Sequence, residues 1–114
     1  EYWMQRMNID EIKKDAENIL VNKNKIIEIG TKIKDKIPNY QYMGILKFSY
    51  IDFLKLYDYY KKIENQMIDM TSFLNLAIHN KIIEIFYKST SDFWLEIDNK
   101  VDLNLAKKIL SKKF

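Results

Sequence analysis

The feature that most constrains this chain is a run of nine positions in its first third, spaced alternately three and four residues apart. Seven of the nine are apolar, and Lys23 and Gly30 are the exceptions. The nine positions are Ile9, Ile12, Ala16, Ile19, Lys23, Ile26, Gly30, Ile33 and Ile37. Such spacing places side chains on one stripe of an α-helix. It therefore predicts a long first helix over about residues 9–37, packed lengthwise against other helices.

Further helices follow from capping residues and apolar spacing. Ser49 with Asp52 three residues later marks a helix start, which predicts a helix near 49–70. Apolar spacing predicts two more helices near 72–88 and 92–112. No helix breaker separates the second and third helices, so they could also be continuous. The predicted fold class is all-α, a single-domain helical bundle of about four helices.

The second predicted helix collects its large apolar residues on one broad arc, which we expect to face the core of the bundle. The arc consists of Phe53, Leu56, Tyr57, Tyr60, Ile63, Met67, Ile68 and Met70.

Length and composition bound the class of protein. A chain of 114 residues is about one domain, 1–114, and because it begins at Glu1 we expect that it can be a segment of a longer protein. The lack of cysteine excludes disulfides and thiolate metal sites. The longest uncharged run, between Asp69 and Lys81, is shorter than the ~20 residues of a membrane span. We expect a soluble, lysine-rich chain with the residue usage of an AT-rich genome, and the sequence predicts no compartment.

No catalytic motif stands out. The sequence has no phosphate-binding glycine loop, no nucleophile elbow and no calcium loop. Asn75 and His79 lie one turn apart on the apolar arc of the third predicted helix. His79 could act as a base or metal ligand, but with one histidine and no cysteine a metal would depend on carboxylates. We favour a buried polar pair whose side chains hydrogen-bond to each other or to nearby backbone, and we expect no enzyme, cofactor or metal.

Lys23 and Gly30 interrupt the apolar stripe and allow two interpretations. A partner helix could approach closely there, as at polar core positions of coiled coils. Alternatively, Lys23 extends its stem over the core and Gly30 only weakens the helix, by ~1 kcal/mol. The second interpretation, which we favour, predicts that Gly30→Ala increases stability.

Rigid aromatic residues concentrate in the connection over residues 38–48. Aromatic side chains bury much area for little rotamer entropy and are enriched at binding hot spots. The candidates for partner binding are Trp3, Pro38, Tyr40, Tyr42 and Met43. The alternative is that these side chains fold back and cover one end of the bundle.

Basic residues suggest a second class of ligand. Lys32, Lys34 and Lys36 lie near the expected end of the first helix, where the helix dipole alone favours them. They could also contact an anion, with Tyr40, Tyr42 and Tyr50 as stacking platforms for a single strand.

Together these observations predict a non-catalytic helical protein–protein interaction or assembly module. It would act through apolar helix faces and the aromatic 38–48 connection, and its partner would be another protein or a second copy of itself. The alternative is a domain that binds nucleic acid or an anionic surface through lysine and tyrosine.

Overall fold

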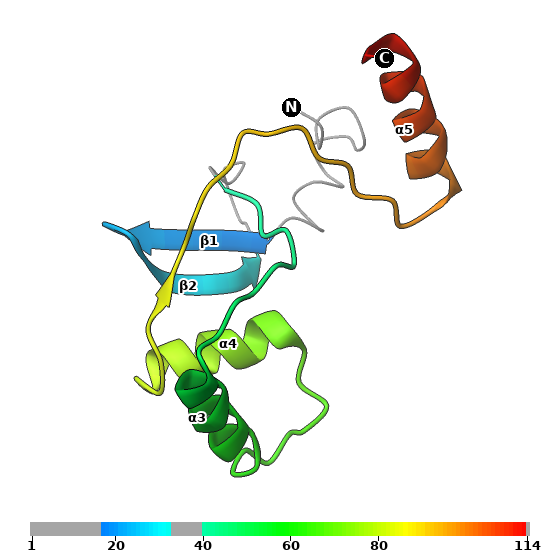
Figure 1. The fold of residues 1–114 in the computed structure, drawn as a ribbon. Coiled ribbons are helices and arrows are strands. Elements are labelled where there is room, and N and C mark those ends of the chain that lie inside the picture. Colours follow the sequence, from blue (N-terminus) through cyan, green and yellow to red (C-terminus); the bar gives the residue numbers. More distant parts are fainter. Residues whose placement is uncertain (1–16, 33–39, 114) are drawn as a thin grey trace. The chain divides into compact units, whose positions relative to one another are not determined.

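The computed structural model describes residues 17–32 and 40–113. The chain divides into two compact units, Lys13–Ser89 and Glu1–Ile12 with Thr90–Phe114. We call the first the larger unit and the second the C-terminal unit. The described residues contain three helices and a three-stranded antiparallel sheet of order β1-β2-β3 (Figure 1). The all-α prediction, a bundle of about four helices, is therefore wrong.

The sheet begins with a hairpin where the sequence predicts the long first helix. Strand β1 spans Glu17–Asn22 and β2 spans Lys25–Lys32, and they pair antiparallel. Lys23 lies in the two-residue turn between them, with a φ of 57°, as the first central residue of a tight hairpin turn requires. The helix over 9–37 is thus wrong for residues 17–32, and the rest of that range lies outside the described residues.

Two bulges explain why the hairpin resembles a helix in sequence. The register places Val21 opposite Ile26 and Ile19 opposite Ile29, so that Ile27 and Gly30 are extra residues on β2. A bulge shifts the inward-facing positions of a strand by one residue. Ile26 and Ile29 consequently both face the core although they are three residues apart, which is the spacing of one helix face.

Helix α3 spans Tyr50–Tyr60 and begins at the N-cap Ser49, as the capping pattern predicts. It ends ten residues before Met70, so the expected helix near 49–70 is wrong in its second half. The Lys62 and Ile63 N–H groups turn back to the Tyr59 and Tyr60 carbonyls, closing the last turn of α3.

Helix α4 spans Met70–His79, with Asp69 as its N-cap, and is separate from α3. It ends in a Schellman motif, in which the Ile82 N–H donates to the Ala77 carbonyl and the Lys81 N–H to the Ile78 carbonyl. Lys81 adopts a φ of 56° there, a position that usually holds glycine. The expected helix near 72–88 is therefore wrong beyond His79. The sequence did not indicate this end, because a lysine rather than a glycine holds the left-handed position.

Beyond α4 the chain forms β3, Ile85–Phe86, which pairs with the first residues of β2. An ion pair between Lys25 and Glu84 lies at the same end of the sheet. In the larger unit, α4 packs against β2, and α3 packs against α4. Their buried side chains form one core, which consists of Ile26, Ile29, Leu56, Phe73, Leu74, Ala77 and Ile83.

The described part of the C-terminal unit, residues 90–113, contains helix α5, Lys100–Lys113. This helix begins later than the expected helix near 92–112. Asn99 Oδ1 accepts the Asp102 N–H, and Asp102 Oδ2 accepts the Asn99 N–H, the reciprocal arrangement of a capping box. None of the helices among the described residues has the length and apolar character needed to span a membrane.

Candidate functional site

Helix α3 exposes most of its apolar side chains. Leu56 is its only buried residue, whereas five large side chains of the helix remain between 40% and 74% exposed: Tyr50, Ile51, Phe53, Leu54 and Tyr57. Tyr50, Phe53, Leu54 and Tyr57 follow the i, i+3, i+4, i+7 spacing of one helix face. We call these four residues the α3 stripe.

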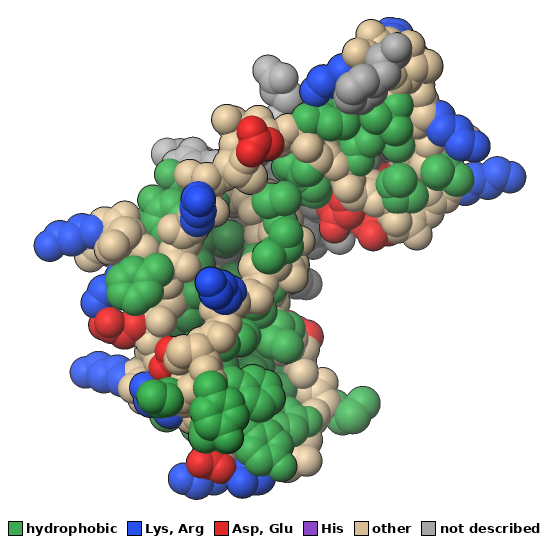
Figure 2. All heavy atoms as spheres, in the orientation of Figure 1, with side chains coloured by type: hydrophobic (Ala, Val, Ile, Leu, Met, Phe, Trp, Pro, Cys, Tyr) green, Lys and Arg blue, Asp and Glu red, His purple; other side chains and the backbone are tan. Residues whose placement is uncertain are grey.

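An apolar groove of about 250 Å³ adjoins this stripe. Its walls come from α3, α4 and the connections before each helix. The groove is lined by Phe48, Phe53, Leu56, Tyr57, Tyr60, Ile68, Met70, Phe73 and Leu74. Figure 2 shows hydrophobic side chains gathered over α3 and its surroundings. A contiguous apolar surface of this kind commonly marks a binding site.

Aromatic rings pack against one another beside the groove, with Phe73 of its lining at the centre. The Phe73 ring stacks on Tyr59 with 6.0 Å between centroids and meets the edge of Tyr60 at 5.7 Å. The Tyr60 hydroxyl donates to the Gln66 carbonyl at 2.7 Å, which ties the loop after α3 back to the helix. Met67, the next residue in this loop, is 93% exposed.

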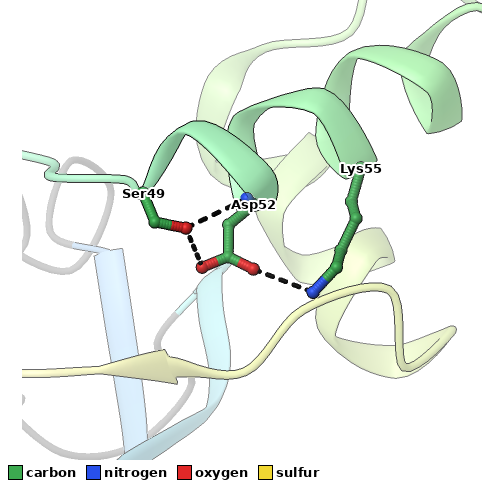
Figure 3. A network of polar contacts seen from close by, with 3 residues as sticks. All are labelled: Ser49, Asp52 and Lys55. Carbon is green, nitrogen blue, oxygen red and sulfur yellow. Dashed lines mark hydrogen bonds and ion pairs between the residues drawn. The ribbon is translucent and has the colours of Figure 1, made fainter.

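Charged residues along α3 are paired with one another. The Ser49 hydroxyl donates to Asp52, and Lys55 Nζ lies 3.0 Å from the second Asp52 oxygen (Figure 3). Hydrogen bonds from Ser49 and then Lys55 lower the pKa of Asp52.

Asp58 and Lys61 form a second ion pair at 2.8 Å. This contact lowers the pKa of Asp58 and raises the pKa of Lys61. Lys61 also lies over the Tyr57 ring, 4.5 Å from its centroid. The surface along the stripe therefore carries balanced charge rather than a field of one sign.

Four of the residues predicted to form sites, Trp3, Pro38, Lys34 and Lys36, lie outside the described residues. Lys32 is the last residue of β2.

The remaining partner-binding candidates lie in the connection before α3. Tyr40 contacts Tyr87, with ring centroids 5.4 Å apart, and a hydrogen bond between the two raises the pKa of Tyr87. Tyr42 packs against the core, and Met43 is exposed. None of these three lines the groove, to which the connection contributes Phe48.

Asn75 and His79, predicted to form a buried polar pair, differ in burial and in the contacts that their side chains make. Asn75 is partly buried, and its Oδ1 accepts the Ile29 N–H at 3.1 Å. His79 is exposed rather than buried, and its Nδ1 lies 2.8 Å from the Asn75 carbonyl. Because a carbonyl only accepts, this contact assigns the proton to Nδ1.

The chemistry of the larger unit favours apolar binding. Within residues 17–32 and 40–113, no three histidine, cysteine or acidic side chains come together as a metal would require. The groove offers aromatic rings and aliphatic walls. Sequence reasoning assigned its α3 residues to the core. The dense aromatic content of Tyr50–Tyr60 was the available signal, because one short helix cannot bury so many rings.

Comparisons of this chain with protein-family models, with curated proteins and with solved structures find no match.

Proposed function

We propose that this chain is a non-catalytic protein-interaction module that binds an apolar segment of a partner chain on the α3 stripe and in the adjoining groove. The observation that carries the proposal is the exposed apolar face of α3, continuous with the groove. Exposing such a face to water is unfavourable by roughly 25 cal/mol per Å² of apolar surface. A partner that covers it recovers this free energy.

Aromatic residues favour the same interpretation. Tyrosine and phenylalanine supply large contact areas at low conformational cost, which makes them frequent anchors of protein interfaces. The groove is lined by four such rings besides the buried Phe73: Phe48, Phe53, Tyr57 and Tyr60. Its volume of about 250 Å³ and its apolar lining suit one or two apolar side chains of an amphipathic helix, the helix-in-groove mode of recognition.

A random peptide library panned on the full chain tests this proposal. We expect the selected peptides to carry apolar residues at helical spacing and to lose binding to Leu54→Glu, which places a charge in the stripe. Leu76→Glu is the matched control, since Leu76 on α4 is as exposed as Leu54, at 40%, but lies outside both the α3 stripe and the groove lining. Selected peptides that bind Leu54→Glu as well as the wild type, or no selected peptides at all, would contradict the proposal.

The alternative, binding to nucleic acid or an anionic surface, stays a prediction. The Lys55 and Lys61 side chains beside the α3 stripe are already engaged by Asp52 and Asp58, so the described surface around the groove adds nothing in its favour.

A further inference from the structure

We infer that the partner on the α3 stripe is a second copy of this chain, paired about a two-fold axis with the two α3 helices antiparallel and Met67 of each copy in the groove of the other. The inference rests on the proposed function, because it names the occupant of the same surface. Four observations on the larger unit carry it.

The first observation is the size of the exposed surface. Six large apolar side chains of the stripe, the loop after α3 and the start of α4 are 40–93% exposed, and the aromatic ones among them offer about 150–250 Å² each. They are Tyr50, Phe53, Leu54, Tyr57, Met67 and Met70. Their combined open area approaches the ~800 Å² that each partner buries in a standard stable interface. One copy of the same surface is enough to cover it.

The second observation is that one molecule carries both the apolar groove and a protruding apolar side chain, that of Met67. Met67 has the highest exposed fraction of the large apolar residues described, and it is not among the residues that line the groove of its own molecule. Methionine is unbranched and flexible, so it fits cavities of irregular shape. A surface that carries both a protruding side chain and a matching hollow is self-complementary, as a two-fold interface requires.

The third observation is that the loop carrying Met67 is held in place. The Tyr60 hydroxyl holds the Gln66 carbonyl, and the Met67 N–H donates to Asn65 Oδ1 at 3.1 Å. These contacts hold the backbone at Met67 in place before a partner binds. Binding then costs less conformational entropy than the ordering of a free loop would.

The fourth observation is the charge along α3. Asp52 lies in the first turn of the helix and Lys61 is its C-cap. An antiparallel second copy opposes the two helix dipoles, which is favourable. Because the charges also pair within each copy, two identical surfaces meet without net repulsion.

Sedimentation velocity on the full chain over a wide range of concentrations tests the inference. We expect a reversible monomer–dimer equilibrium in the wild type. Met67→Ala should weaken it about tenfold or more, as for a central anchor of an interface, and Leu54→Glu should abolish it. Leu76→Glu, the equally exposed control, should dimerise like the wild type.

Circular dichroism and thermal unfolding of each variant separate loss of assembly from loss of fold. Should Leu54→Glu fail to fold, Tyr50→Glu replaces it, because Tyr50 is more exposed and belongs to the same stripe. A wild type that stays monomeric at every concentration overturns the inference. So does a dimer that these substitutions leave intact, since it must use another surface.

The two proposals fail differently. A monomeric chain whose α3 stripe still binds selected peptides overturns only the second copy as partner. A monomeric chain whose stripe binds no peptide overturns both.

Discussion

The side-chain oxygen of Asn75 on α4 accepts the backbone N–H of Ile29 on β2, 46 residues away in sequence. Ile29 is 2% exposed, so its N–H has no ready access to water as a substitute acceptor. A buried donor left without a partner is costly. This one hydrogen bond therefore helps to hold helix α4 in place against the sheet.

Removing that acceptor should destabilise the larger unit. We expect Asn75→Ala to lower the free energy of unfolding by about 1–3 kcal/mol, and to speed hydrogen exchange at the Ile29 amide. Asn75→Asp keeps an acceptor at the same position and should retain most of the protection. Chemical denaturation and amide exchange measure both effects, and equal protection in wild type and Asn75→Ala would show that the bond contributes nothing.

Gly30 should not tolerate a side chain. It has a φ of 81°, and a Cβ there would lie 2.8 Å from both Cβ and Oγ1 of Thr71. A left-handed conformation costs a residue with a side chain roughly 1–2 kcal/mol, and overpacking adds about 1–3 kcal/mol. Gly30→Ala should therefore destabilise the chain, the opposite of the gain expected from a glycine inside a helix.

Gly44→Ala provides the control for Gly30→Ala. Gly44 has a similar φ of 78°, but nothing lies within 4 Å of the position that a Cβ would take there. It should incur only the backbone cost, so that the difference between the two variants in urea denaturation reports the close approach to Thr71. If the two variants lose the same free energy of unfolding, the close approach to Thr71 contributes nothing.

Leu74 and Leu76 on α4 form a second matched pair. Leu74 is fully buried and lines the groove, so Leu74→Ala should cost about 2–5 kcal/mol. Leu76 is 40% exposed, and Leu76→Ala should cost much less. Thermal unfolding followed by circular dichroism measures the difference, and similar losses would contradict the observed burial.

Asp69, the N-cap of α4, should make the protein less stable at acid pH. The Ser72 backbone N–H, followed by the Ser72 and Thr71 hydroxyls, lowers its pKa below the ordinary 3.8. Its ionised form thus stabilises the fold above about that pH, and this contribution is lost as the pH falls through the lower folded value.

Asp69→Asn keeps the capping oxygen without the charge. Its stability difference from the wild type should therefore shrink below about pH 4 in denaturation measured across pH. Asp69→Ala removes the cap altogether and should cost about 0.5–2 kcal/mol at neutral pH. A difference between wild type and Asp69→Asn that stays constant with pH would contradict this role.

Lys81 is a position where substitution should stabilise the protein. It holds a left-handed conformation at the end of α4, with a φ of 56°. Glycine avoids the steric cost but loses more entropy on folding, so we expect Lys81→Gly to gain about 0.5–1 kcal/mol. Chemical denaturation measures the gain, and a loss of stability would show that the lysine side chain contributes more than its backbone costs.

Local signals in this sequence predicted helix starts better than helix ends. The Ser49–Asp52 pattern marks the start of α3 correctly because a capping hydrogen bond forms between residues three apart. The end of α4 escaped prediction, since Lys81 takes the position at which glycine would have signalled a stop. The groove escaped prediction as well, because a helical wheel shows which residues share a face but not whether another element covers that face.

The first third of the chain shows where local pattern fails. Ile19 and Ile26 are seven residues apart. This separation fits two turns of one helix, but it also fits two residues on the opposite strands of a hairpin, which is where the structure places them. From the sequence alone follow the start of α3 at Ser49, the lack of disulfides and the identity of the apolar residues that must be covered. Only tertiary structure decided between helix and hairpin, because the pairing of β1 with β2, the Asn75 bond to Ile29 and the fit of Gly30 against Thr71 join residues far apart in the chain. Such contacts have no periodicity to detect.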